Sequence, residues 1–271
     1  MNSRAFWFAG SCAVVCLVAA SPPGHCAPAC EPSVSVEPVS AGLSRISISA
    51  PCFAGGHISL RYDSLTLVRV LDENGALTVL FDCYLGEKPP LKLTFPDGME
   101  IQAQLRTIDL ERVTKVALFW RGRVNLDLHA FEYAADFNDV GHVWAGAPSS
   151  RWQAEERHRR DKLGHGFMTT VSDGTSEGDQ LEVYTFIHEP SQASGAVTLA
   201  LDYESRARIP QEPDSCGTGL YADLEYRVAV WRPNGSVSRT RGSFAPLPCG
   251  HPSDQTARYN SKALPQLILT R

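Results

Sequence analysis

The sequence lacks any long apolar run after its first twenty residues, and it lacks an excess of positive charge. Of its 271 residues, 43% are hydrophobic and 20% are charged, which is near the average for globular proteins and excludes a chain that is disordered throughout. A net charge of −5 argues against a bulk electrostatic affinity for nucleic acid or anionic lipid. The missing apolar runs exclude a protein with several membrane spans.

The chain also lacks compact motifs of several enzyme classes. It has no H-E-x-x-H zinc motif and no G-x-x-x-x-G-K-[S/T] phosphate loop. A Ser-His-Asp triad stays open, because its members need not be adjacent in sequence. The sequence therefore favours a non-catalytic protein without deciding the point.

The first thirty residues predict export. One cation, Arg4, precedes an uncharged stretch over residues 5–20, as in the positive start and apolar core of a secretory signal peptide. This stretch is shorter than the ~20 residues that a membrane span needs. Two cleavage positions are expected, between Ala20 and Ser21 or between Ala29 and Cys30. The mature chain is therefore expected to be secreted or periplasmic and not to span a membrane.

The cysteine content agrees with export. Two of the eight cysteines lie in the predicted signal peptide, and the even number that remains indicates disulfides in an oxidising compartment. The absence of C-x-x-C leaves a thiol redox site or a zinc ribbon without support. We predict the pairs Cys30–Cys52 and Cys216–Cys249, each flanking strands of one domain, and leave open whether Cys26 and Cys83 pair.

Apolar residues recur at every second position through most of the chain, which predicts short β-strands. Glycine-containing turns at 72–75, 96–98 and 233–235 predict three hairpins, spanning 67–79, 91–103 and 226–244. The continuous apolar run over 116–120 suits a central strand. Only 150–162 has helical character, and its mixed charges indicate a solvated insertion.

This density of strands predicts an all-β protein with two immunoglobulin-like β-sandwiches in tandem after the signal peptide. The expected organisation is a signal peptide (1–20), a tail (21–29), a small sandwich (30–106), a larger sandwich (107–250) that carries the charged insertion, and a C-terminal tail (251–271). In that last segment, 264–269 is apolar and is expected to add an edge strand or to dock loosely.

Residues 120–130 carry the polar side chains with most chemical content. Alternate residues of a strand share a face, so Leu126 and Leu128 are expected in the core, with Asn125, Asp127 and His129 together on the opposite, water-facing side. Neighbours on that face lie ~6.5–7 Å apart at Cα. This spacing suits a hydrogen bond, a shared metal ion or an acid–base pair.

A metal site needs further ligands, and the acidic loop over 173–182 offers Asp173, Asp179 and Glu182. One hypothesis is therefore a divalent cation, Ca²⁺ or Zn²⁺, held by these acids with Asp127 and His129. The loop lacks the D-x-D-x-D-G spacing of a dedicated calcium loop. The preferred interpretation is a polar strand face that orients neighbouring loops.

Aromatic rings supply a second kind of contact. Trp144 and Trp152 stand outside the predicted strands, and exposed aromatic rings on a β-sandwich stack on sugars or anchor protein partners. The predicted ligand-binding surface comprises Asn125, Asp127, His129, His142, Trp144 and Trp152.

The motif W-x4-N-L-D-L-H-A at 120–130 resembles a strand of a bacterial secreted module of unknown function, in which a Trp precedes Asp-x-Asp-Leu-His-Val. The likeness extends loosely over 116–244. Asn125 stands at the first Asp of that pattern, Ala130 at its Val, and Leu181-Glu182 at a Pro-Glu pair. The resemblance implies an exported β-sandwich without a defined activity, and the missing carboxylate weakens an implied metal site.

These features predict an exported, non-catalytic binding or envelope-associated accessory protein, whose partner is a protein or glycan of the cell envelope and not a nucleic acid. Two alternatives stay open. One is a metal-dependent hydrolase that uses Asp127 and His129. The other is an accessory subunit of an envelope transport or assembly system, docked through the small N-terminal domain.

Overall fold

The structure is a computed structural model that describes residues 31–121, 125–172, 178–189, 195–204, 224–244, 264 and 267–269. Pro32–Arg271 form one compact unit. The predicted signal peptide and tail, with Cys26 and Cys30, lie outside the described residues, as do Cys216 and Cys249. No helix in the described ranges is long and apolar enough to cross a membrane.

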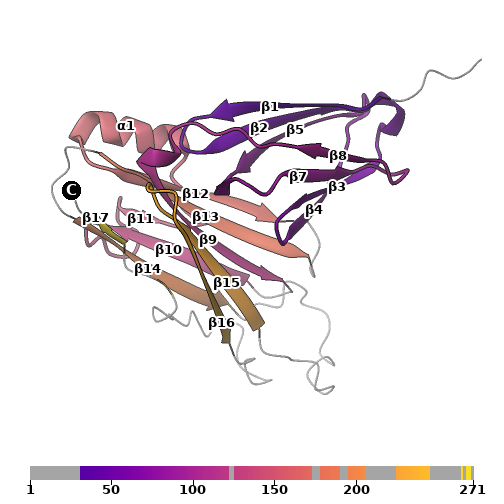
Figure 1. Cartoon of the computed structure of the whole chain (residues 1–271). Coiled ribbons are helices and arrows are strands. Elements are labelled where there is room, and N and C mark those ends of the chain that lie inside the picture. Colours follow the sequence, from indigo (N-terminus) through magenta and orange to yellow (C-terminus); the bar gives the residue numbers. More distant parts are fainter. Residues whose placement is uncertain are drawn as a thin grey trace, which may run out of the picture. The chain divides into compact units, whose positions relative to one another are not determined.

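The fold is all-β, as predicted, and the strands of the described residues form four sheets in which every pairing is antiparallel (Figure 1). The first sheet has the order β1 (Ser33–Val39), β2 (Leu43–Ser49), β5 (Ala76–Asp82). The second has the order β4 (Leu65–Val70), β3 (His57–Tyr62), β7 (Leu91–Thr94), β8 (Glu100–Ala103). The third has the order β12 (His165–Ser172), β13 (Asp179–Ile187), β9 (Val113–Arg121), β15 (Leu224–Trp231), β16 (Val237–Phe244). The fourth has the order β11 (His142–Val143), β10 (Asn125–Glu132), β14 (Gly195–Glu204), β17 (Leu267–Leu269).

Three short elements of the described chain lie outside these four sheets. The strand β6 (Tyr84–Glu87) contacts β15, and the 3-10 turns η1 (Pro51–Phe53) and η2 (Leu110–Arg112) precede β3 and β9. The expected edge strand in 264–269 is confirmed, because β17 pairs with β14 at the edge of the fourth sheet.

The strands β9 and β13 of the third sheet are buried on both faces, which explains their long apolar runs. On one face, Leu118 belongs to a cluster with Leu128 of the fourth sheet. On the other face, Phe119 belongs to a cluster with Ile46 of the first sheet and Leu60 of the second. The central strand predicted over 116–120 is therefore confirmed as β9. The predicted boundary between the two sandwiches at residue 107 stays a prediction. Residues from both sides of it, such as Leu60 and Phe119, belong to the same hydrophobic cluster.

Two of the three predicted hairpins are confirmed, namely β7–β8 and β15–β16. The hairpin predicted over 67–79 is wrong, because β4 pairs with β3 whereas β5 pairs with β2 in another sheet. Its turn does form, with the Gly75 N–H donating to the Asp72 carbonyl over 3.0 Å. The Gly75 carbonyl accepts the Ala50 N–H at 2.8 Å, so the chain leaves the turn toward the first sheet. Local turn chemistry reversed the chain without fixing which strands pair.

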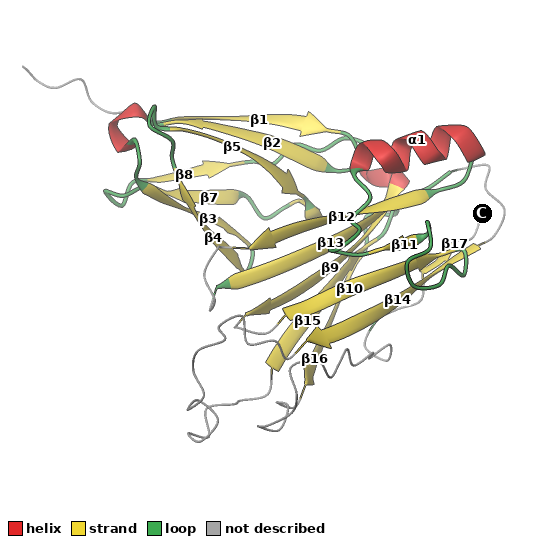
Figure 2. Cartoon of the chain, turned by 180° about the vertical axis from the view of Figure 1, so that it is seen from behind, coloured by secondary structure: helices red, strands yellow, loops and turns green. Residues whose placement is uncertain are grey.

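The helix expected in 150–162 is confirmed as α1 (Arg151–Asp161), which contacts β12 (Figure 2). A reciprocal capping box between Ser150 and Gln153 starts it, and Lys162 ends it in the left-handed conformation. Only Ala154 of the helix is buried, which agrees with a charged insertion on the surface of the sheets.

Candidate functional site

The predicted alternation along β10 is confirmed on its apolar side only. Leu126 and Leu128 are fully buried in the core between the third and fourth sheets. The expectation that the polar face meets water is wrong, because Asp127 is 6% exposed and His129 only 2%. His129 is buried by a segment that follows it in the chain. The strand β11 pairs with the end of β10, and rings of the 131–144 segment stack on the imidazole. The side chain of Asn125 lies outside the described set.

Five rings form what we call the histidine–aromatic cluster: His129, Phe131, Phe137, His142 and Trp144. The β10–β11 register places Phe131 opposite His142, and their ring centroids lie 4.6 Å apart at 4°. His129 stacks on Trp144 at 5.0 Å and 19°. Phe137 meets the Phe131 ring edge-on at 5.0 Å and 69°. These distances and angles are those of favourable aromatic contacts, so the cluster is a preorganised stack.

A chain of hydrogen bonds assigns one tautomer to each histidine of the cluster. The Asn138 N–H donates to His142 Nδ1 over 3.1 Å, which leaves the proton of neutral His142 on Nε2. That Nε2–H faces His129 Nδ1 at 2.8 Å, so Nδ1 of His129 is the acceptor. The proton of His129 therefore sits on Nε2, which points toward Asp202 Oδ2 at 3.9 Å.

Burial keeps both rings neutral. It lowers the pKa of His129 to about 4, and the neighbouring His142 lowers it further. Burial also lowers the pKa of His142, with Asp139 opposing the shift. At neutral pH the pair is thus an oriented relay of two uncharged imidazoles.

The acid beside this relay, Asp202, was missed from the sequence. The β10–β14 register places it directly opposite Asp127, and both side chains are buried. Facing residues of such a pair have Cβ atoms about 4.5–5.5 Å apart. Its signal was present in the sequence, since Asp202 is the one charged side chain of the G-A-V-T-L-A-L-D-Y segment.

The predicted metal ligands do not assemble in the described part of the chain. Asp179 accepts hydrogen bonds from Arg121 Nε and from the Thr66 N–H, each at 2.7 Å. Glu182 lies in the interior and accepts the Leu128 N–H. Asp173 lies outside the described residues. Among the described His, Cys, Asp and Glu side chains, no group of three or more is arranged to hold a metal ion.

Trp152 is also separate from the cluster, at least as far as the described contacts go. It lies in the first turn of α1, with 62% of its surface exposed. Trp152 is therefore an exposed ring that does not belong to the stack.

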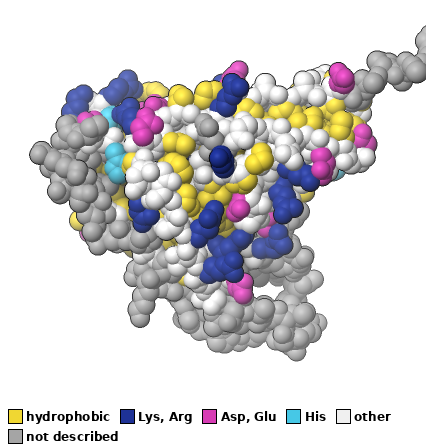
Figure 3. Space-filling model, in the orientation of Figure 1, with side chains coloured by type: hydrophobic (Ala, Val, Ile, Leu, Met, Phe, Trp, Pro, Cys, Tyr) yellow, Lys and Arg dark blue, Asp and Glu magenta, His cyan; other side chains and the backbone are white. Residues whose placement is uncertain are grey.

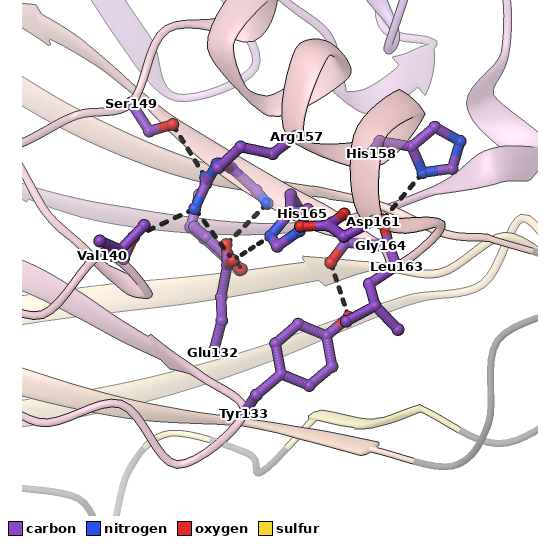
Figure 4. Close-up of polar contacts among 12 residues, drawn as sticks. Glu132, Tyr133, Val140, Ser149, Arg157, His158, Asp161, Leu163, Gly164 and His165 are labelled. Carbon is purple, nitrogen blue, oxygen red and sulfur yellow. Dashed lines mark hydrogen bonds and ion pairs between the residues drawn. The ribbon is translucent and has the colours of Figure 1, made fainter.

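A second group of polar residues, which we call the charged network, joins β10, β12 and α1 (Figure 4). His165 Nδ1 lies 2.8 Å from Glu132 Oε2, and His165 Nε2 lies 3.1 Å from both carboxylate oxygens of Asp161. An imidazolium that donates from both nitrogens satisfies this geometry. Glu132 also accepts the Gly166 N–H at 2.7 Å and the Tyr184 hydroxyl at 3.0 Å. Burial opposes ionisation of Asp161, but the charge and hydrogen bond of His165 prevail and lower the pKa of Asp161.

Arg157 extends the network to the loop that covers the histidine–aromatic cluster. Its Nη1 lies 3.6 Å from Glu132 Oε2 and donates to the Val140 carbonyl at 3.1 Å. Its Nη2 donates to Ser149 Oγ at 2.9 Å and to the Gly166 carbonyl at 3.1 Å. The network thus fixes α1 and the loop before β11. The mixed charges of 150–162 gave no sign that Arg157 bonds to Glu132 of β10 or that Asp161 bonds to His165 of β12.

Two other features concern catalysis and binding. Residues 174–178 read G-T-S-E-G and so match the pattern G-x-S-x-G, but the next described element in the chain is the strand β13, whereas a helix follows a nucleophile elbow. A cavity of about 330 Å³ opens beside α1 and η2, with Arg112, His158 and Arg159 in its lining. The His158 ring is already engaged there, with Nε2 3.0 Å from Glu189 Oε2.

Comparison with known proteins identifies no family: no family model matches this chain, and no curated protein matches it.

Proposed function

We propose that this chain is an exported, non-catalytic binding protein of the cell envelope, built from two tandem immunoglobulin-like sandwiches, with the histidine–aromatic cluster as its contact surface. The observation that carries the proposal is the partial exposure of an otherwise rigid stack. Phe137 is 47% exposed, although its ring contacts His129, Phe131 and His142. An exposed ring held in a fixed orientation loses little conformational entropy when a ligand packs on it.

The polar groups around the stack support binding over catalysis. A general acid or base must present its atom to a substrate. Both nitrogens of His142 and Nδ1 of His129 are occupied within the protein. Glu132 likewise accepts hydrogen bonds from Gly166, Tyr184 and His165. The hydrogen bonds of His129, His142 and Glu132 fix the positions of these side chains within the protein. Their arrangement gives no support to the alternative of a hydrolase that uses Asp127 and His129.

A glycan of the envelope is the ligand that best fits the surface. Sugar rings present C–H faces that pack on aromatic rings, while their hydroxyls hydrogen-bond to polar side chains nearby. The exposed ring of Phe137 offers the apolar contact, and the exposed side chains of Asp136, Asn138 and Asp139 beside it offer hydrogen bonds. An envelope protein is the other class of partner that a surface aromatic patch anchors.

The cysteines beside the first sheet bear on the proposed export. Cys52 lies in η1, which follows β2, and its predicted partner Cys30 lies outside the described residues. The pair Cys30–Cys52 stays a prediction. Cys83 is buried, with Sγ 3.3 Å from Ser44 Oγ.

The test is titration of the mature protein with purified envelope polysaccharides, followed by tryptophan fluorescence and calorimetry. Phe137→Ala removes the exposed ring and is expected to weaken binding at least about tenfold, since a hot-spot aromatic is worth ~2 kcal/mol. Trp152→Ala, which removes an exposed ring outside the stack, is expected to leave binding unchanged.

Equal affinity of the Phe137→Ala variant and the parent protein would contradict the proposed surface. Release of shorter sugars by the parent protein, abolished in Asp127→Asn, would instead establish the hydrolase alternative and refute the non-catalytic function.

A further inference from the structure

The strand β16 forms an edge of the third sheet. In the described residues it pairs only with β15, through eight consecutive residue pairs without a bulge and without proline. The side chains from Ser238 to Arg241 are all exposed. Such an edge presents a row of backbone N–H and C=O groups to which another strand can hydrogen-bond.

Three arginines share one face of this edge, and we call them the arginine ladder: Arg227, Arg239 and Arg241. The register places Arg227 directly opposite Arg241, and Arg239 is the next residue of β16 on the same face. Figure 3 shows cationic side chains gathered in the lower middle of this side of the molecule. This concentration is local, because the whole chain carries a net charge of −5.

The arginine ladder lacks a counter-charge among the described residues. None of its three guanidinium groups has a carboxylate oxygen within ion-pair distance there. Glu225 is the one acid of β15 on this face, and Arg121 at the end of β9 is already paired with Asp179. Like charges directly opposite each other are unfavourable in a sheet. The Arg227 guanidinium is instead held over the Phe119 ring, 5.5 Å from its centroid.

We propose that the edge of β16 binds an extended, acidic segment of a partner protein, which adds a strand to the third sheet and places alternate carboxylates against the arginine ladder. The periodicity favours a peptide over a flat anionic surface. Arg239 and Arg241 are two residues apart, a repeat of ~6.5–7 Å, which is also the spacing of alternate residues on an added strand. This surface is distinct from the histidine–aromatic cluster and does not depend on glycan binding there.

The test uses the mature chain and a fluorescent eight-residue peptide that alternates threonine and glutamate, with binding read by fluorescence anisotropy. The double variant R239E/R241E is expected to lose at least about tenfold in affinity. The matched double variant R45E/K92E changes the net charge by the same amount at the exposed Arg45 of the first sheet and the half-buried Lys92 of the second, and it is expected to bind as the parent does.

A second probe separates strand addition from simple charge attraction without altering the protein. Two peptides, one methylated at the threonine nitrogens and one at the glutamate nitrogens, keep all the carboxylates but each lose the backbone donors of one edge. The peptide whose methyl groups face β16 is expected to bind at least about tenfold more weakly than the unmethylated peptide. Equal binding of both methylated peptides would overturn the proposal, as would an equal loss in R45E/K92E. Failure of the parent protein to bind the peptide, while it binds vesicles rich in anionic lipid, would also overturn it and assign the arginine ladder to a lipid surface. None of these results bears on the Phe137→Ala titration, so the two proposals fail separately.

Discussion

Glu182 of β13 accepts the backbone N–H of Leu128 of β10 at 2.7 Å, and this hydrogen bond links the third sheet to the fourth through the core. Burial raises the pKa of Glu182 to about 8, with the Leu128 hydrogen bond opposing and Asp127 adding to the shift. The interior thus favours the neutral carboxyl, whose carbonyl oxygen still accepts the Leu128 proton.

The first prediction concerns stability against pH. Because the folded pKa of Glu182 lies above its value of 4.5 in the unfolded chain, folding binds a proton, and this contribution declines as pH rises from about 4.5 to about 8. Glu182→Gln keeps an acceptor but does not ionise, so the variant is expected to gain stability relative to the parent between pH 5 and pH 9, on the order of a few kcal/mol. Urea unfolding at both pH values measures the difference. Glu37→Gln, on the exposed face of β1, is the control; the same pH dependence in parent and Glu182→Gln would refute the prediction.

The second prediction concerns the tautomers of the histidine pair. Both His129 and His142 are expected to carry their proton on Nε2 at pH 7, because Asn138 and then His142 donate to the Nδ1 atoms. Long-range ¹H–¹⁵N NMR spectra distinguish the two tautomers.

Lowering the pH is expected to protonate His129 only near pH 4. The contribution of the neutral His129 ring to folding stability is therefore lost as pH falls from about 6.5 toward 4. His57, exposed at the start of β3, gives an internal reference. An Nδ1–H signal from either cluster histidine would show that the relay is oriented otherwise.

The third prediction concerns the charged network. Glu132→Ala removes the buried acceptor of His165, Gly166 and Tyr184, and leaving such donors without a partner costs about 3–5 kcal/mol. Glu156→Ala breaks an exposed ion pair on α1 and is expected to change stability by no more than about 0.5 kcal/mol. Denaturant unfolding compares the two variants. Similar stabilities would mean that the network does not fix α1 to the sheets.

The fourth prediction uses two glycines with similar backbone angles in different surroundings. Gly75 and Gly98 have φ of +72° and +86°, so alanine is strained at both, by roughly 1–2 kcal/mol. A Cβ at Gly98 would meet nothing within 4 Å, whereas one at Gly75 would lie 2.2 Å from the Ala50 carbonyl oxygen. Gly75→Ala is therefore expected to destabilise the fold by at least about 1 kcal/mol more than Gly98→Ala. Equal thermal midpoints of the two variants would contradict the close approach of the 72–75 turn to Ala50.

The sequence by itself determined the features whose causes are local. Alternation along β10 placed Leu126 and Leu128 in the core, the composition of 150–162 indicated the helix α1, and the turn at 96–98 gave the β7–β8 hairpin. Each of these depends on side-chain periodicity or on hydrogen bonds within a few residues.

The tertiary structure decided what depends on segments far apart in the chain. It sent β4 and β5 into different sheets, although a well-formed turn joins them. It buried His129 beneath rings from the segment that follows β10, and it brought Asp202 opposite Asp127 across 75 residues of sequence. Alternation assigns a residue to one of two faces, but whether that face meets water or another layer is settled by packing of distant elements, which a local pattern does not encode.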